Sequence, residues 1–150
     1  MAHLDLKLEN LLISDDCSIK LCDFGFCESL HSKTYATLGS QGYMAPEIKI
    51  SKSYDRISAD VFALGVVLFI LEFGGPPFEE ASASDPLYRR IPAHRAFFSS
   101  HPATARAFRE GGVDTDMADL IMAMLDPNPG MRPKSVKEVR NHEYLRGARG

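Results

Sequence analysis

An apolar run near the middle of the chain limits the fold more than any other feature. Residues 61–71 form 11 consecutive positions without a charged side chain. A membrane-spanning helix needs about 20 such residues, so this run predicts a helix buried inside a globular domain. We expect the helix body over residues 61–73, with Ser58 and Asp60 as capping residues and the Gly-Gly-Pro-Pro sequence at 74–77 as its end. A helix that is apolar nearly all round should be central and surrounded by other helices.

Weaker patterns fill in the remaining elements. Short apolar segments at 10–13 and 18–22 flank a polar turn, which predicts a small β-hairpin. Residues 23–47 show no clear period and predict a long irregular segment, of a kind that often carries function. Spacing and capping signals predict further helices at 85–91, 102–110, 115–125 and 135–141. The expected fold is mainly α with a small β element, in one domain over residues 1–150 whose tail starts at about 146.

Composition excludes several classes of protein. The net charge is −3, and the Lys and Arg residues are scattered, so no nucleic-acid footprint is expected. The three cysteines (Cys17, Cys22 and Cys27) lack paired metal-ligand spacing, which favours free thiols over disulfides or a zinc site. Charged residues interrupt the N-terminus, so no signal peptide is expected. We therefore expect a cytoplasmic or nuclear protein without a membrane or nucleic-acid partner.

Three short motifs follow one another in the first third of the chain. HLDLKLEN at 3–10 resembles the H-R-D-L-x-x-x-N catalytic loop of protein kinases, and the sequences DFG at 23–25 and APE at 45–47 resemble two further kinase motifs. Each is short enough to arise by chance. Their order and separation, continued by DVFALGV from Asp60 and by DPNP…RP at 126–133, make residues 3–145 similar to the eukaryotic-type serine/threonine protein kinases.

This resemblance implies the C-terminal lobe of a kinase, with a central apolar helix and a small hairpin. The sequence starts two residues before the catalytic loop. It therefore holds no glycine-rich phosphate loop, no strand Lys of the V-A-I-K type and no helix Glu to pair with that Lys. We expect the N-terminal lobe, and half of the ATP cleft with it, to be absent from this chain. We expect Met1 to be an internal Met of a longer protein, a gene-model error or the start of a real truncation.

The resemblance assigns chemical roles in phosphoryl transfer from ATP and Mg²⁺. Asp5 would accept and orient the substrate hydroxyl, and Lys7 would neutralise charge on the transferring group. Asn10 and Asp23 would supply oxygen ligands to Mg²⁺. An isolated Asp is more often a turn or cap residue, but Asp5 stands beside Lys7, Asn10 and Asp23, which favours the chemical role. Gly25 is expected to let the backbone turn sharply after Asp23.

The resemblance also assigns residues to the nucleotide pocket. Leu12 would form the floor under adenine, and Cys22 would line the pocket, with a thiol that is either reactive or buried and inert. His3 is expected to pack under Phe24. We favour this structural role for His3 over a titrating one.

Four further residues are expected to organise the site. Glu47 would pair with Arg132, and Asp60 would accept backbone N–H bonds from the catalytic loop. Ser40 would bond to the catalytic Asp and Lys. The presence of Lys7 and Ser40 points to Ser and Thr hydroxyls as substrates.

Two positions depart from the family pattern. Leu4 replaces the Arg that normally receives the phosphate of a phosphorylated activation segment. Ala36 stands where the usual phosphoacceptor would be. We therefore expect that phosphorylation at that position does not order the segment, while Thr34, Tyr35 and Thr37 remain candidates for modification.

Glu9 has two open interpretations. In Arg-directed kinases this residue helps to bind a basic substrate residue, but Ile70 stands where the partner acid is expected. A solvated carboxylate is the alternative. The GYMAPE run and the HEYL sequence at 142–145 are similar to calmodulin-dependent-type kinases.

The expected function is ATP-dependent phosphorylation of protein Ser/Thr hydroxyls, with Mg²⁺, as part of a complete kinase. Its partners would be protein substrates and a missing N-terminal lobe or a regulatory protein. The alternative is a non-catalytic half-kinase that acts as a binding or scaffold module. This chain alone is expected to be inactive. Leu12, Leu21, Cys22 and Phe24 are expected near the face on which the other lobe would pack.

Overall fold

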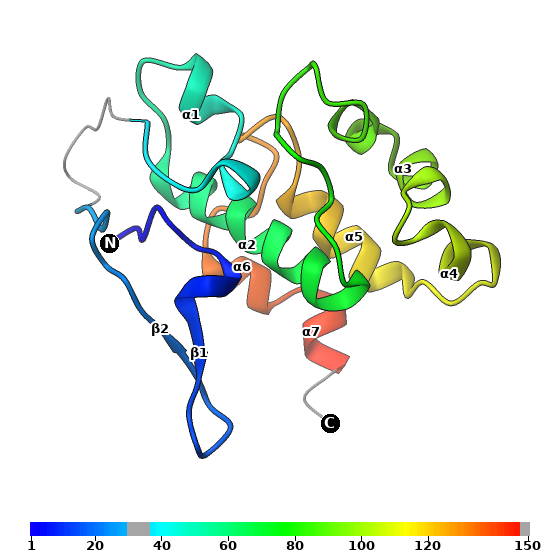
Figure 1. The fold of residues 1–150 in the computed structure, drawn as a ribbon, viewed down its shortest axis with the longest axis horizontal. Coiled ribbons are helices and arrows are strands. Elements are labelled where there is room, and N and C mark those ends of the chain that lie inside the picture. The colour runs from blue at the N-terminus through cyan, green and yellow to red at the C-terminus, as the bar shows by residue number, and fades with distance from the viewer. Residues whose placement is uncertain (30–36, 148–150) are drawn as a thin grey trace.

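The apolar run forms the central helix of a mainly helical body (Figure 1). The computed structural model describes residues 1–29 and 37–147. Helix α2 (Arg56–Phe73) buries Phe62 and Phe69 completely and packs along α5 (Thr115–Met124). The two helices come close at Gly65, where an added Cβ would lie 2.9 Å from the Cβ of Met124. The predicted central helix is therefore confirmed, and a glycine sets how closely its neighbour packs.

The start of α2 differs from the prediction. Asp55 is the N-cap, and its side chain accepts the backbone N–H of Ser58 at 3.0 Å. The prediction that Ser58 and Asp60 cap the helix is wrong, because the helix has begun before the apolar run starts. The end is as expected: Gly74 adopts φ 77, in the left-handed region that glycine enters without strain.

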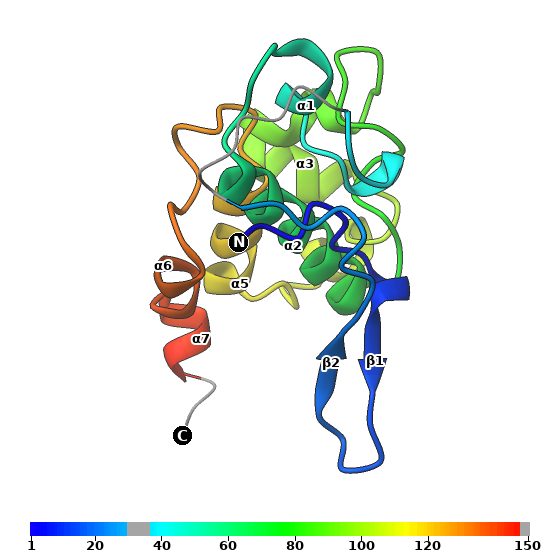
Figure 2. The same cartoon turned by 90° about the vertical axis from the view of Figure 1, so that its left-hand side faces the viewer.

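A β-hairpin projects from one side of the helical body (Figures 1 and 2). A short 3-10 helix, η1 (Leu8–Asn10), leads into β1 (Leu11–Ile13), which pairs antiparallel with β2 (Ile19–Leu21). The predicted hairpin is therefore confirmed. Its apolar side chains face solvent: Ile13 and Ile19 are 78% and 68% exposed. A two-stranded hairpin is only marginally stable by itself. The stability of this hairpin should therefore increase when another surface packs against its exposed apolar side chains.

The smaller helices follow the sequence less closely. Their bounds are η2 (Gln41–Tyr43), α1 (Glu47–Ile50), η3 (Tyr88–Ala93), α3 (His94–Ser100), α4 (Ala105–Arg109), α6 (Val136–Arg140) and α7 (Glu143–Gly147). The helix predicted at 85–91 is a 3-10 helix that starts later, because the Asp85 carboxylate binds the backbone N–H groups of a turn, those of Leu87 and Tyr88 among them. The predictions did not include α3 or α7. The last turn of α7 overlaps the expected tail.

Over the described residues the fold is mainly helical, with one antiparallel hairpin. None of the helices in the described ranges is long and apolar enough to cross a membrane.

An ion pair inside the protein joins three distant parts of the chain. The guanidinium of Arg132 binds Glu47 at the start of α1 through two hydrogen bonds of 2.6 and 2.9 Å. It also donates to the carbonyls of Ser58 in α2 and of Asp126. The side chain of Arg132 is fully buried and lies over the Phe62 ring, 4.8 Å from its centroid. The expected Glu47–Arg132 contact is thus present, with nearly all of its polar atoms satisfied.

Replacing Glu47→Gln should destabilise the protein strongly, because the buried Arg132 charge would lose its counter-ion. We expect the free energy of unfolding to fall by about 3–5 kcal/mol, measured by urea denaturation. Glu110→Gln is the matched control, because Glu110 pairs with Arg106 at the surface with a side chain 62% exposed. Equal stability of the two variants would contradict the structural role of the buried pair.

Candidate active site

A carboxylate on the second turn of α2 holds the start of the loop that contains Asp5. The two oxygens of Asp60 accept the backbone N–H groups of His3 at 2.7 Å and of Leu4 at 2.8 Å. Burial raises the pKa of Asp60, and the two N–H donors partly offset this. The contact expected from the sequence is present, and it fixes the loop directly to the central helix.

Leu4 adopts an unusual backbone conformation. Its φ is 66, in the left-handed region, where a non-glycine residue costs about 1–3 kcal/mol. The side chain is only 5% exposed and lines a small apolar void with Leu38 and Ile48. Gly39, at φ 113, lies against the Leu4 carbonyl, and a Cβ there would come within 3.1 Å of that oxygen. Leu4 is thus an interior residue, and it packs against the segment that contains Leu38 and Gly39.

The predicted modification positions can be placed only in part. Thr37 is described and exposed. Ala36, Thr34 and Tyr35 lie outside the described residues, so the expectation about segment phosphorylation stays a prediction.

Three side chains form a closed hydrogen-bonded triangle. The Nζ of Lys7 lies 2.9 Å from Asp5 Oδ2 and donates to Ser40 Oγ at 2.7 Å. The Ser40 hydroxyl in turn donates to Asp5 Oδ1 at 2.8 Å. The tertiary fold therefore brings Ser40, which precedes η2, to the two expected catalytic residues.

The triangle determines the charges of its members. Burial tends to raise the pKa of Asp5, but the hydrogen bonds from Lys7 and Ser40 outweigh it and hold the pKa below its ordinary value. The hydrogen bond to Asp5 raises the pKa of Lys7. Asp5 is therefore a carboxylate and Lys7 a cation at neutral pH, which provides a hydrogen-bond acceptor and a positive charge side by side.

Asn10 is oriented by the same carboxylate. Its amide nitrogen donates to the Asp5 backbone carbonyl at 2.8 Å and to Asp5 Oδ2 at 3.3 Å. The side-chain nitrogen of Asn10 donates both of these hydrogen bonds, so the side-chain oxygen of Asn10 remains available to bind a ligand. The Asn10 carbonyl accepts the N–H of Cys22 at 2.9 Å, which ties the loop to the residue before Asp23.

Asp23 itself makes the sharp turn that was expected of Gly25. Asp23 has φ 59, whereas Gly25 is not among the residues with positive φ. Aspartate tolerates this region because its short side chain bonds to the local backbone, here to the N–H of Gly25 at 3.3 Å. The expectation about Gly25 is therefore wrong in its detail. The Asp23 carboxylate is exposed and free to meet a ligand.

The candidate metal ligands do not form a self-contained metal site. Among the described residues, no three His, Cys, Asp or Glu side chains gather closely enough to hold an ion. Asn10 and Asp23 offer hard oxygen donors, which suit Mg²⁺ only when phosphate or water oxygens complete its coordination.

His3 supports this part of the site through both ring nitrogens. Nδ1 accepts the N–H of Asp5 at 3.2 Å, and Nε2 lies 3.1 Å from the Cys22 carbonyl, so Nε2 carries the proton. The ring meets Phe24 edge-on, with centroids 5.2 Å apart. His3 thus bridges the two segments that carry Asp5 and Asp23.

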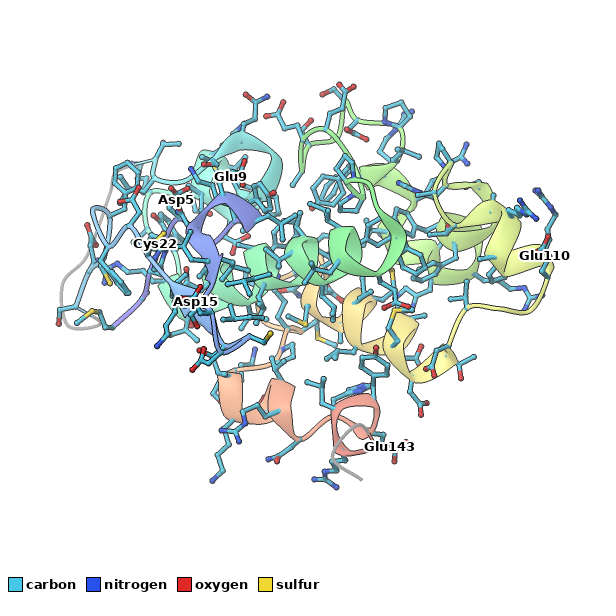
Figure 3. The ribbon with its side chains drawn as sticks, turned by 60° about the horizontal axis from the view of Figure 1, so that its bottom comes forward. Asp5, Glu9, Asp15, Cys22, Glu110 and Glu143 are labelled. Atoms are coloured by element: carbon cyan, nitrogen blue, oxygen red, sulfur yellow. The ribbon has the colours of Figure 1, made fainter. Side chains whose placement is uncertain are left out.

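The residues expected to contact nucleotide lie on an open face. Leu12, Leu21 and Phe24 are 52%, 37% and 57% exposed. Cys22 is a half-buried free thiol. Figure 3 shows Asp5, Glu9 and Cys22 at the same end of the molecule. Glu9 is exposed and accepts a long hydrogen bond, 3.4 Å, from the Tyr43 hydroxyl, which leaves both interpretations of Glu9 open.

Sequence reasoning missed Arg56 and Glu28. Their side chains meet with Nε and Oε2 2.9 Å apart. Arg56 precedes Asp60 by one helical turn, and this spacing was the only signal in the sequence that linked it to the site.

The chain matches known proteins along nearly its whole length. Residues 1–145 match the protein kinase domain. The chain is 34% identical over 149 residues to the probable serine/threonine-protein kinase CCRP1 of Zea mays, covering 97% of this chain and 22% of that protein. It is 36% identical over 150 residues to the SNF-related serine/threonine-protein kinase of Homo sapiens, with 98% and 18% covered. It is 32% identical over 150 residues to CBL-interacting protein kinase 2 of Oryza sativa subsp. japonica, with 97% and 31% covered.

The chain therefore spans less than half the length of each of these relatives. The match over residues 1–145, together with this similarity to serine/threonine-protein kinases, shows that the chain belongs to the protein kinase family.

Proposed function

We propose that this chain carries the catalytic residues of a kinase that phosphorylates Ser and Thr hydroxyls of proteins with ATP and Mg²⁺. The observation that carries the proposal is the Asp5–Lys7–Ser40 triangle, which holds an ionised carboxylate and a cation at one point. The proposal covers the activity of a complete kinase that includes this chain.

The chain's own residues would act by orientation and charge. Asp5 accepts the hydrogen bond of the substrate hydroxyl and takes up its proton as the oxygen attacks phosphorus. Lys7 neutralises the negative charge that develops on the transferring group. Ser40 holds both side chains in place.

The donor set suits the cofactor that the family generally uses. Mg²⁺·ATP would supply the transferable phosphoryl group. Asn10, through its amide oxygen, and Asp23, through its carboxylate, would hold the metal. Leu12 and Cys22 would lie beside the nucleotide base, on the exposed face of the hairpin.

The second candidate is a non-catalytic module that binds a partner protein. The exposed apolar side chains of the hairpin and Phe24 favour it, because such a patch on a soluble domain marks a contact surface. Under this alternative the hairpin face binds the partner and the triangle serves only to hold the loop.

Residues 1–150, purified alone, should transfer no phosphate. The chain contains no glycine-rich loop to position ATP, and positioning supplies most of the catalysis in this reaction. The measurement is incorporation of labelled phosphate from ATP into a generic Ser/Thr substrate. Metal-dependent incorporation that is lost in the Asp23→Ala variant would overturn this expectation.

Asp5→Asn should abolish catalysis in the protein as its gene encodes it. The amide cannot take up the hydroxyl proton, so we expect kcat to fall by at least about 100-fold. Asp15→Asn is the matched control, because Asp15 is an exposed residue of the hairpin turn. An inactive wild-type gene product would favour the binding module, and an active Asp5→Asn variant would contradict the role of Asp5.

Ser40→Ala should impair catalysis by loosening the triangle. Hydrogen bonds to charged groups are worth about 1.5–3 kcal/mol, so we expect kcat to fall by roughly 10- to 100-fold. Ser40→Thr keeps the hydroxyl and should stay close to wild type. Equal activity of the Ala and Thr variants, by the same labelled-phosphate assay, would count against the triangle as the arrangement that matters.

A further inference from the structure

The first turns of α2 carry two charged side chains that each hold a different segment. Arg56 and Asp60 stand four residues apart, so they share one face of the helix. Asp60 binds the backbone of His3 and Leu4. Arg56 contacts the Glu28 carboxylate and donates from Nη1 to the Ser29 carbonyl at 2.9 Å.

The two segments held in this way are also bonded to each other. Ala2 and Glu28 form an antiparallel bridge, with N–H to carbonyl distances of 3.0 and 3.1 Å. The Cys27 thiol donates to the Ala2 carbonyl at 3.0 Å. In Figure 2 the N-terminal segment and the segment after β2 cross the same end of α2 side by side. Arg56, Asp60 and the bridge thus connect α2 with both segments.

The Arg56–Glu28 contact is not what stability alone would favour. Arg56 is only 6% exposed, whereas the Glu28 side chain is 29% exposed. Nε and Oε2 are close but not aligned for a hydrogen bond, and Nη2 has no hydrogen-bond partner among the described residues. Buried charges with incomplete hydrogen bonding are often replaced by apolar residues without loss of stability. A role in placing the segment explains the contact better.

The segment in question carries Asp23. Its beginning is fixed at Cys22, whose N–H binds Asn10 and whose carbonyl lies 3.1 Å from the His3 ring. Its end is fixed at Glu28. Asp23 lies between these two points, exposed and in a left-handed conformation, so its position depends on how both ends are held.

We propose that Arg56 is a positioning residue for Asp23, acting through Glu28 as Asp60 acts on the loop of Asp5. One face of α2 would then set the distance between the proton acceptor and the metal ligand. The inference rests on the proposed function for the role of Asp23, but the anchoring contacts themselves lie within the described residues and can be tested apart from catalysis.

Amide hydrogen exchange of the purified chain, followed by NMR, tests the anchoring without any need for catalysis. Arg56→Met should speed exchange of the Glu28 amide by roughly tenfold, because the bridge to Ala2 loses its support. The Gly25 amide, bonded to Asp23, should shift its resonance. The His3 and Leu4 amides should stay protected. Asp60→Asn should give the opposite pattern, with His3 and Leu4 affected first.

Two controls separate positioning from general destabilisation. Val139→Ala removes core volume from the cluster that also contains Val61 of α2, without removing the Arg56–Glu28 contact, and should change exchange without singling out Glu28. Arg56→Lys keeps the positive charge and should restore part of the protection at Glu28. If Arg56 only filled space, the Arg56→Lys variant would not restore the protection of the Glu28 amide.

Glu28→Gln covers the case in which Arg56→Met does not fold. The Gln side chain keeps the shape of Glu28, and the Arg56 hydrogen bond to Ser29 stays in place, so this variant removes only the charge of the contact and should loosen the same amides. The inference is overturned if Glu28 and Gly25 are unchanged in Arg56→Met or Glu28→Gln, or if these variants alter all amides uniformly as Val139→Ala does. Selective loosening in a protein whose gene product shows no kinase activity would instead overturn the proposed function and leave the anchoring in place.

Discussion

The carboxylate of Asp60 is the contact on which the geometry of the site depends. It projects from a helix whose interior position is secured by apolar packing, so α2 offers a rigid support. By accepting two successive backbone N–H groups it holds a loop that contains a strained residue, Leu4. Asp5, Lys7 and Asn10 follow directly. With the start of this loop fixed to α2, Lys7 and Asn10 lie within hydrogen-bond distance of Asp5.

Charge is confined to a few places in the interior, and each place joins segments far apart in sequence. Glu47 and Arg132 connect α1 with the loop before α6, and Asp5 and Lys7 bind Ser40 across more than thirty residues. Such pairs contribute little net stability because desolvation offsets their attraction, but they are costly to break on one side. They therefore specify one arrangement of irregular segments that apolar packing alone would leave loosely defined.

Much of the framework could be predicted from the sequence, because its signals are local. The central helix was predicted from an uninterrupted apolar run, the hairpin from two apolar segments around a polar turn, and α5 from helical spacing, while the motifs pointed to Asp5, Lys7, Asn10 and Asp23. The errors have physical reasons. The cap of α2 lies outside its apolar run, Asp85 turns an expected helix start into a turn, and the left-handed turn falls on Asp23 and not on Gly25. In each case a side-chain to backbone bond, invisible to hydrophobic patterning, decided the local conformation.

The sequence by itself determined the family, the mainly helical class and the identity of the charged residues, since these depend on residue type and spacing. The motifs also implied some of their contacts, such as Glu47–Arg132, and only the tertiary structure decided the others. Arg56 and Glu28 are unremarkable in sequence and become partners because the segment after Asp23 returns to the start of α2. The resemblance implied the contact of Ser40 with Asp5 and Lys7, but the lowered pKa of Asp5 depends on the hydrogen-bond geometry that the fold gives these three side chains. Contacts such as Arg56–Glu28 depend on how the whole chain packs, and no local pattern encodes them.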